Sequence, residues 1–216
     1  MPHPTITALR SLVDTRFPAT TRKPCGLVAT GIAKIDDVLG GGLPTGKLTE
    51  LVSPRAGSGG QLAQTQILAA TRRARQRVAL IDAADAFAPD RAIPDHLRHL
   101  VWVRPTGIND ALAATDVLVR DGNYGIILLD LRGSPAAELK RIPATRWHRL
   151  HRAAESSPAA ILVQTTQDLV PAVTWRLSLE GAALWSDRRC PQLTLLQQLK
   201  VAIVRGPILA REELAG

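Results

Sequence analysis

The middle of the chain alternates short apolar runs with stretches in which apolar residues recur every three or four positions. The first pattern is typical of strands buried on both faces, and the second of amphipathic helices. Their alternation predicts a parallel sheet whose strands are joined by crossover helices. The predicted strands are Leu48–Val52, Val78–Asp82, Leu100–Val103, Ile126–Asp130 and Ala159–Gln164.

The predicted crossover helices are Leu62–Arg75, Asn109–Arg120 and Thr145–Ser156, with Asn109 as the N-cap of the second. After the fifth strand the pattern changes. Thr174–Leu179 and Leu199–Val204 alternate apolar and polar residues around Gly181, as antiparallel strands do. We therefore expect an α/β fold with helices on both faces of a mostly parallel, twisted sheet that has an antiparallel C-terminal edge.

The 216 residues, 45% of them hydrophobic, are enough for one well-packed core. We expect an N-terminal arm over residues 1–24, a core over residues 25–210 and a tail over residues 211–216. The arm combines a helix and a proline-flanked linker, and its apolar side chains are Ile6, Leu9, Val13 and Phe17. Two roles stay open for this arm: folding back on its own core, or docking on another protein or a second copy.

Cys25 and Cys190 are too far apart in sequence to indicate a disulfide framework or a zinc site. The chain also lacks a signal peptide and any run of about 18 apolar residues. We therefore expect a cytoplasmic protein with no bound metal and no association with membranes.

The net charge of +8 comes mainly from arginine, whose planar guanidinium binds phosphates and carboxylates. Candidate contacts with DNA or an acidic partner are Arg72, Arg73, Arg75, Arg146, Arg149 and Arg152. Trp147, Trp175 and Trp185 are the candidates for stacking on bases. Solvated arginines and buried tryptophans are the competing interpretation.

A glycine-rich string, Thr30–Gly46, leads directly into the first predicted strand. It resembles the RecA-like recombinase family, which carries the pattern Thr-Gly-x3-Leu-Asp-x2-Leu-Gly-x-Gly-Leu-Pro-x-Gly before its phosphate loop. The resemblance continues through Glu50–Pro54, Leu80–Ala83 and Tyr124–Asp130 and covers roughly residues 28–205. It implies a RecA-like core without the C-terminal domain of RecA.

The segment in the place of the phosphate loop departs from the pattern Gly-x4-Gly-Lys-Ser/Thr. The remnant comprises Ser53, Pro54, Gly57, Ser58, Gly59, Gly60 and Gln61. Gly59 stands where the family has the lysine, and Gly60 where it has the hydroxyl that binds Mg²⁺. Ala84 stands where the recombinases have the glutamate that activates water. Losing all three groups should abolish ATP hydrolysis, so we expect neither catalytic residues nor a cofactor.

Asp130 matches the carboxylate of the Walker B strand, and Gln164 lies near the polar residue that senses the γ-phosphate in recombinases. Without a metal to position, we expect Asp130 to bond to N–H groups or hydroxyls of the loop. The stretches that follow these two residues are shorter than the DNA-gripping loops that RecA carries there.

These features together are similar to the ImuA-type accessory proteins of damage-induced mutagenesis. The resemblance implies an adaptor in an SOS-induced complex for translesion DNA synthesis, and an ImuB-type polymerase homologue as partner. RecA, non-specific DNA and a second copy of the chain are further candidate partners.

Two other functions remain open. Backbone amides of Gly57–Gly60 could hold an anion at a helix N-terminus, as in a nucleotide-binding regulator with an atypical loop. A division inhibitor resembling SulA would also have a degenerate RecA-like fold. The intact glycine string favours the accessory protein over the division inhibitor.

Overall fold

The computed structural model describes residues 26–171, 173–181, 190 and 192–207. The predicted arm, with Ile6, Leu9, Val13 and Phe17, therefore lies outside the described residues, as do residues 211–216 and Trp185. Within the described part of the chain, no helix combines the length and the apolar character needed to span a bilayer.

A seven-stranded sheet forms the centre of the molecule, in the order β5-β4-β6-β7-β3-β8-β9. All neighbouring strands are parallel except the last pair, β8 and β9, which is antiparallel. The strands are β3 (Leu48–Val52), β4 (Val78–Asp82), β5 (Leu100–Val103), β6 (Ile126–Asp130), β7 (Ala160–Thr165), β8 (Trp175–Glu180) and β9 (Lys200–Arg205). The predicted mostly parallel sheet with an antiparallel edge is confirmed.

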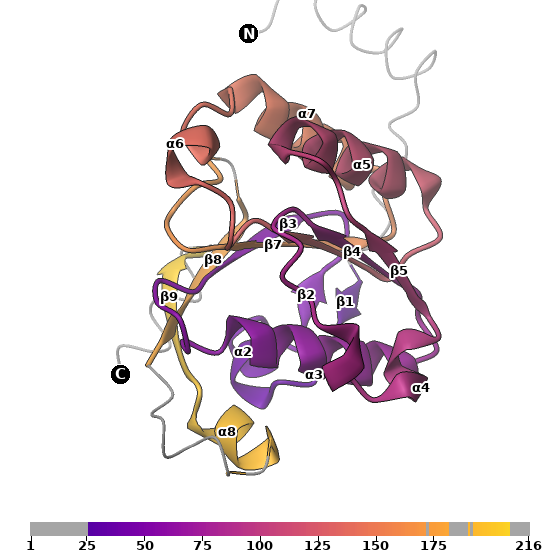
Figure 1. The fold of residues 1–216 in the computed structure, drawn as a ribbon, viewed down its shortest axis with the longest axis vertical. Coiled ribbons are helices and arrows are strands. Elements are labelled where there is room, and N and C mark those ends of the chain that lie inside the picture. Colours follow the sequence, from indigo (N-terminus) through magenta and orange to yellow (C-terminus); the bar gives the residue numbers. More distant parts are fainter. Residues whose placement is uncertain (1–25, 172, 182–189, 191, 208–216) are drawn as a thin grey trace, which may run out of the picture.

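Helices cover both faces of this sheet, with α5, α6 and α7 on one side and α2, α3, α4 and α8 on the other (Figure 1). Their bounds are α2 (Ala33–Val38), α3 (Gly60–Arg73), α4 (Pro94–Leu97), α5 (Ile108–Asp121), α6 (Ala136–Leu139), α7 (Ala144–Glu155) and α8 (Gln192–Gln198). A 3-10 turn, η1 (Pro89–Arg91), precedes α4, and β1 (Leu27–Val28) pairs with β2 (Leu43–Pro44) in a separate small sheet.

The strands divide their side chains between two apolar layers. In β6, Ile126 and Leu128 join the layer that contains Ile67 of α3, whereas Ile127 and Leu129 join the layer that contains Trp147 of α7. Every residue of β3, β4 and β6 is buried. Burial on both faces explains why these strands are nearly continuous apolar runs in the sequence.

Three details of the predicted helices were wrong. The N-cap of α5 is Gly107 and makes no side-chain hydrogen bond; Asn109 lies inside the first turn. Instead the Thr106 hydroxyl donates to the Asp110 carboxylate. Helix α3 begins at Gly60, two residues before the predicted start, and α8 was not predicted. Local propensity is a weak guide at helix ends, and α8 is too short for its periodicity to identify it.

The glycine-rich string forms a compact turn that is held by one carboxylate. Asp36 accepts hydrogen bonds from the Thr30 N–H (2.8 Å), the Thr30 hydroxyl (2.7 Å) and the Gly31 N–H (3.0 Å). Gly40, Gly41 and Gly42 all have positive φ, which glycine adopts readily. A Cβ on Gly42 would lie 2.4 Å from the carbonyl oxygen of Val28. The string is therefore a structural element that positions β2 and the start of β3.

Replacing Asp36 by alanine removes a charged acceptor from three donors, so Asp36→Ala should lower the free energy of unfolding by about 2–4 kcal/mol. Urea denaturation followed by circular dichroism measures this. Asp37→Ala is the matched control, because the neighbouring Asp37 is exposed. Equal effects of the two substitutions would contradict the structural role of Asp36.

Candidate functional site

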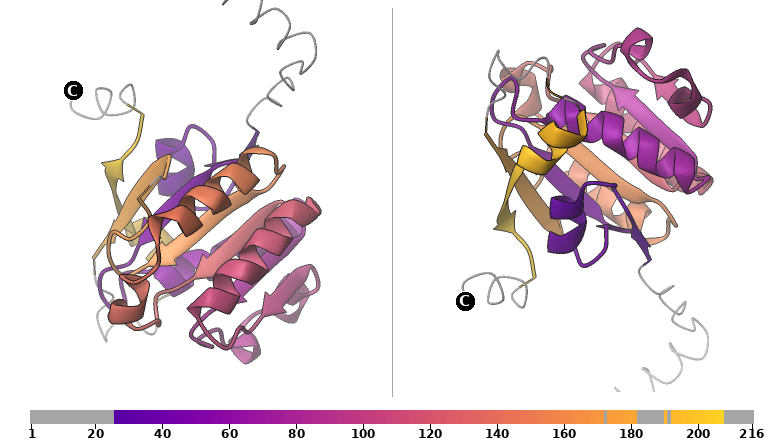
Figure 2. Two further views of the ribbon diagram at one scale, coloured as in Figure 1. Left: turned by 90° about the horizontal axis from the view of Figure 1, so that it is seen from above. Right: turned by 90° about the horizontal axis from the view of Figure 1, so that it is seen from below.

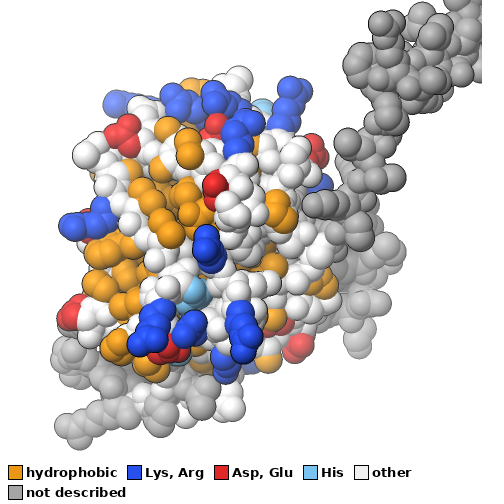
Figure 3. All heavy atoms as spheres, turned by 90° about the vertical axis from the view of Figure 1, so that its right-hand side faces the viewer, with side chains coloured by type: hydrophobic (Ala, Val, Ile, Leu, Met, Phe, Trp, Pro, Cys, Tyr) orange, Lys and Arg blue, Asp and Glu red, His pale blue; other side chains and the backbone are white. Residues whose placement is uncertain are grey.

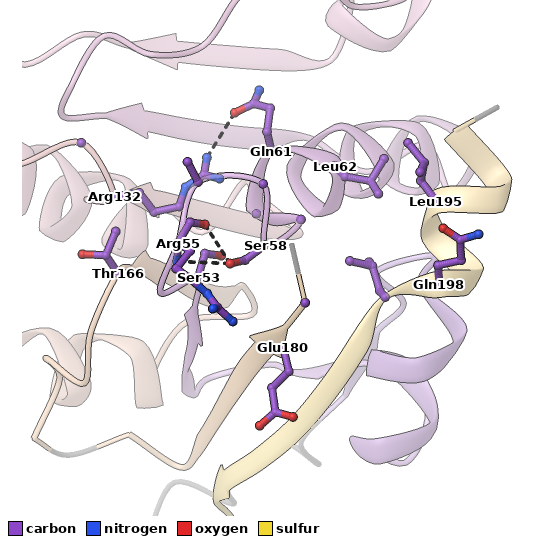
Figure 4. Close-up of a pocket in the computed structure, with 17 residues that line it drawn as sticks. Ser53, Arg55, Ser58, Gln61, Leu62, Arg132, Thr166, Glu180, Leu195 and Gln198 are labelled. Carbon is purple, nitrogen blue, oxygen red and sulfur yellow. Dashed lines mark hydrogen bonds between the residues drawn. The ribbon is translucent and has the colours of Figure 1, made fainter. Parts of the chain in front are cut away.

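The remnant loop, residues 53–61, connects the carboxyl end of β3 to the N-terminus of α3, the place where ligands bind in open α/β sheets. A cavity of about 520 Å³ opens here. The loop and Arg132 line one part of it, and Glu180, Leu195 and Gln198 line other parts (Figure 4). All of the predicted loop residues except Pro54 thus line one cavity.

The loop closes on itself through a serine. The Ser58 hydroxyl donates to the Arg55 carbonyl (2.7 Å) and accepts from the Arg55 N–H (3.2 Å). Gly57 and Gly59 have φ values of 82° and 104°, which only glycine adopts without strain. At the base of the loop, the hydroxyl of Ser53 is buried and has no hydrogen-bond partner among the described residues.

At the two positions that carry lysine and hydroxyl in the family's pattern, a side chain would collide with neighbouring side chains as they are placed. A Cβ on Gly59 would lie 2.3 Å from Cδ2 of Leu199, and the φ of 104° at Gly59 strains any other residue. A Cβ on Gly60 would lie 2.3 Å from Nη1 of Arg132 and 2.6 Å from Oγ of Ser53. Side chains at these positions would therefore require Leu199 and Arg132 to move.

Asp130 bonds to Arg132, and not to N–H groups or hydroxyls of the loop, so the predicted partners were wrong. The guanidinium donates from Nε to Oδ1 (2.9 Å) and from Nη2 to Oδ2 (2.5 Å) of Asp130. Its Nη2 also donates to Oε1 of Gln61 (3.2 Å) and of Gln64 (3.1 Å) in α3. The two charged side chains are 16% and 5% exposed. A cation from the chain thus neutralises the carboxylate that would face a metal.

Sequence reasoning missed Arg132, although Asp-x-Arg at the end of a buried strand was a signal. Gln164, the other candidate at this edge, lies beside Asp130 in the register of β6 and β7. Its Nε2 donates to the carbonyl of Gly60 (3.1 Å). This hydrogen bond holds the first turn of α3 against the sheet.

Ala84 lies close to the loop after β6, since a Cβ on Gly133 would be 2.4 Å from that of Ala84. The adjacent Asp85 forms two hydrogen bonds with the Arg104 guanidinium, at 2.6 and 2.5 Å, on the surface. Hydrogen bonding to Arg104 holds the pKa of the Asp85 carboxyl below its usual value, against an opposing effect of desolvation. A carboxylate so stabilised is a weak base, and its partner holds it away from the cavity.

A second buried ion pair, between Glu50 and Arg176, was also not predicted from the sequence. Glu50 in β3 is fully buried and accepts from the Thr165 hydroxyl (3.1 Å), the Leu169 N–H (2.9 Å) and Nε of Arg176 (2.6 Å). Arg176 also donates to the Val170 carbonyl (2.7 Å). These contacts fix the stretch after β7 to the sheet, in the region where RecA has a DNA-gripping loop.

The candidate arginines fall into two groups on opposite faces of the sheet. Arg72, near the end of α3, makes a bidentate pair with Asp95, and Arg73 and Arg75 are exposed beside it. Arg146, Arg149 and Arg152 are exposed along α7. Viewed from the side of β5, basic side chains gather over both helical layers with apolar side chains between them (Figure 3).

Two of the three candidate stacking residues are buried. Trp147 and Trp175 are 1% and 9% exposed and belong to the two core layers. For these two residues the competing interpretation, burial in the core, holds.

Several bacterial proteins are similar to more than half of the chain. "Protein RecA" of Streptomyces venezuelae is 31% identical over 125 residues, 56% of this chain and 33% of that protein. "Protein RecA" of Leifsonia xyli subsp. xyli is 33% identical over 130 residues, 58% of this chain and 36% of that protein. The chain therefore spans about a third of the length of the curated relatives it matches.

The family model of the RecA N-terminal domain matches residues 15–141. This match includes the glycine-rich string, the remnant loop, α3 and the Walker B-like strand β6, and it covers more than half of the chain. The parallel sheet with crossover helices and the loop between β3 and α3 agree with it. The chain belongs to the RecA family.

Proposed function

We propose that this RecA-family chain is an ImuA-type accessory protein that does not hydrolyse ATP and acts as an adaptor in an SOS-induced complex for mutagenic translesion DNA synthesis. The observation that carries the proposal is that side chains of the chain itself occupy the sheet edge where the family's pattern places its phosphate- and metal-binding residues. Arg132 neutralises Asp130, while the positions of the lysine and the hydroxyl are glycines enclosed by Leu199 and Arg132.

Energetics support the loss of nucleotide chemistry. A hydrogen bond to a charged group contributes roughly 1.5–3 kcal/mol, so loss of the lysine alone removes a large part of phosphate affinity. Positive charges that stabilise the transferring phosphoryl group are worth orders of magnitude in rate, and Arg132, one of the two described arginines that line the cavity, already pairs with Asp130.

A second candidate function is nucleotide binding without hydrolysis, as in a RecA-family regulator with an atypical loop. The N-terminus of α3 opens on the cavity, and the buried Ser53 hydroxyl beside it has no partner among the described residues. Amide groups at a helix N-terminus bind anions. Calorimetry with MgATP separates the two functions, because only the nucleotide-binding regulator should bind the nucleotide.

Calorimetry with MgATP and a phosphate-release assay should detect no binding tighter than about 1 mM and no hydrolysis above background. Gly59→Lys combined with Gly60→Thr should not restore either, because the new side chains collide with Leu199 and Arg132. An active RecA protein is the positive control. Micromolar binding by the wild type would favour the nucleotide-binding regulator. Hydrolysis by the wild type would overturn the proposal, and hydrolysis by the double variant would contradict the steric argument.

Arg132→Ala should lower the free energy of unfolding by about 2–4 kcal/mol, because it leaves the buried Asp130 carboxylate without its counterion. Arg104→Ala is the matched control on the exposed pair with Asp85, and we expect a smaller effect. Chemical denaturation measures both. If the two losses are equal, Arg132 does not have the structural role assigned to it.

The proposed partners are an ImuB-type polymerase homologue and RecA, with non-specific DNA and self-association as further candidates. Affinity purification of the tagged chain from damage-treated cells, followed by mass spectrometry, should recover a translesion polymerase homologue. Cells without damage are the control. Recovery of a division protein in its place would favour the SulA-like alternative.

A further inference from the structure

A groove runs between α5 and α7, on the face of the sheet opposite α3, the helix that follows the remnant loop. The two helices lie side by side over the sheet (Figure 2, left view). Two hollows, of about 200 and 400 Å³, follow one another along this seam. Residues 112–117 face residues 146–150 at the first hollow, and residues 119–122 face residues 152–158 at the second.

The first hollow has an apolar floor and an apolar rim. Leu112 and Leu150 form the floor and are 6% and 3% exposed. Val117 on the rim is 66% exposed, more than any other large hydrophobic side chain in the described part of the chain. An exposed apolar side chain beside an apolar hollow is a feature of protein-binding sites.

Arginines surround both hollows. Arg146 and Arg149 line the first, and Arg120 and Arg152 line the second. The one carboxylate that lines either hollow, Asp116, already accepts from Arg149 (2.9 Å) and Arg120 (3.1 Å). Within the described residues, Arg146 and Arg152 form no ion pair with a carboxylate. The groove is therefore apolar at its floor and positive at its rim.

We propose that this groove binds an acidic amphipathic helix of a partner protein. An apolar side chain would enter the first hollow beside Val117, and carboxylates would pair with Arg146 and Arg152. The length of α7, 12 residues, allows contact with about three turns of a partner helix, or roughly 18 Å. The inference rests on the proposed adaptor function, since it assigns that adaptor a docking surface.

The observations favour a protein over a nucleic acid as the occupant. A phosphate backbone gains little from an apolar floor, and the carboxylate of Asp116 lines the first hollow, where it would repel phosphate. The nearest tryptophan, Trp147, is buried beneath α7 and cannot stack on a base. Electrostatic attraction to the arginines should still make binding sensitive to salt.

The probe is a fluorescein-labelled, 18-residue peptide with leucines on one helical face and glutamates on the other. Its binding to the full chain is followed by fluorescence anisotropy at low salt. We expect saturable binding that weakens at least tenfold with Arg146→Glu and with Val117→Ser. Matched controls on the other face of the sheet are Lys34→Glu and Ile93→Ser, which should change the dissociation constant less than twofold.

Two further probes test the occupant: the same peptide with lysine for glutamate, and a labelled oligothymidine. The proposal is overturned if the wild-type chain does not bind the acidic peptide, or if the groove variants behave like their controls. It is also overturned if the groove variants weaken only oligothymidine binding, which would assign the groove to nucleic acid. ATP hydrolysis by the wild-type chain would refute the proposed function but leave a positive peptide result intact.

Discussion

Burial of the parallel sheet on both faces is the constraint on which the rest of the structure depends. Parallel strands need a crossover between them, so the helices lie on the two faces and all the parallel strands end at the same edge. At that edge the carboxyl ends of β3, β6 and β7 bring the remnant loop, Asp130 and Gln164 together from distant parts of the chain. The same topology places α5 and α7 side by side and so creates the groove between them.

Charged side chains buried in the sheet and at its edge impose an electrostatic requirement. Charged groups removed from water are costly unless they are paired and hydrogen-bonded. Asp130 meets this requirement with Arg132, and Glu50 meets it with Arg176 and the backbone after β7. A nucleotide-hydrolysing enzyme must leave such groups available to a metal and phosphates. Here their hydrogen-bonding capacity is used within the chain, which is the physical basis for proposing an adaptor.

The fold could be predicted in some detail because its signals are local. β3, β4, β5 and β6 have the predicted bounds, since each is a short apolar run with an abrupt end. The start of α5 was misplaced because Asn109 is a good cap in isolation, whereas the chain begins the helix after Gly107. Helix α8 was missed because its pattern of leucine and glutamine is too short for periodicity to identify.

The candidate site was predictable in part. The resemblance to the RecA-like family pattern located the remnant loop, Asp130 and Ala84. Arg132 was not identified, since its contacts to Gln61 and Gln64 join residues 71 and 68 positions apart in the sequence. Asp-x-Arg at the end of β6 was a local signal for the pair with Asp130, but no local pattern indicates that the same guanidinium also reaches α3.

The amino-acid sequence by itself determined the alternation of strands and helices, the turn of the glycine string and the absence of lysine from the loop, because each depends on neighbouring residues. Only the tertiary structure decided that Arg132 occupies the space beside Gly60 and neutralises Asp130. It alone also decided that Trp147 is buried and that arginines of α5 and α7 share one groove. These outcomes depend on packing between elements that are distant along the chain. The distances between their side chains, and the space left between them, exist only in the assembled fold.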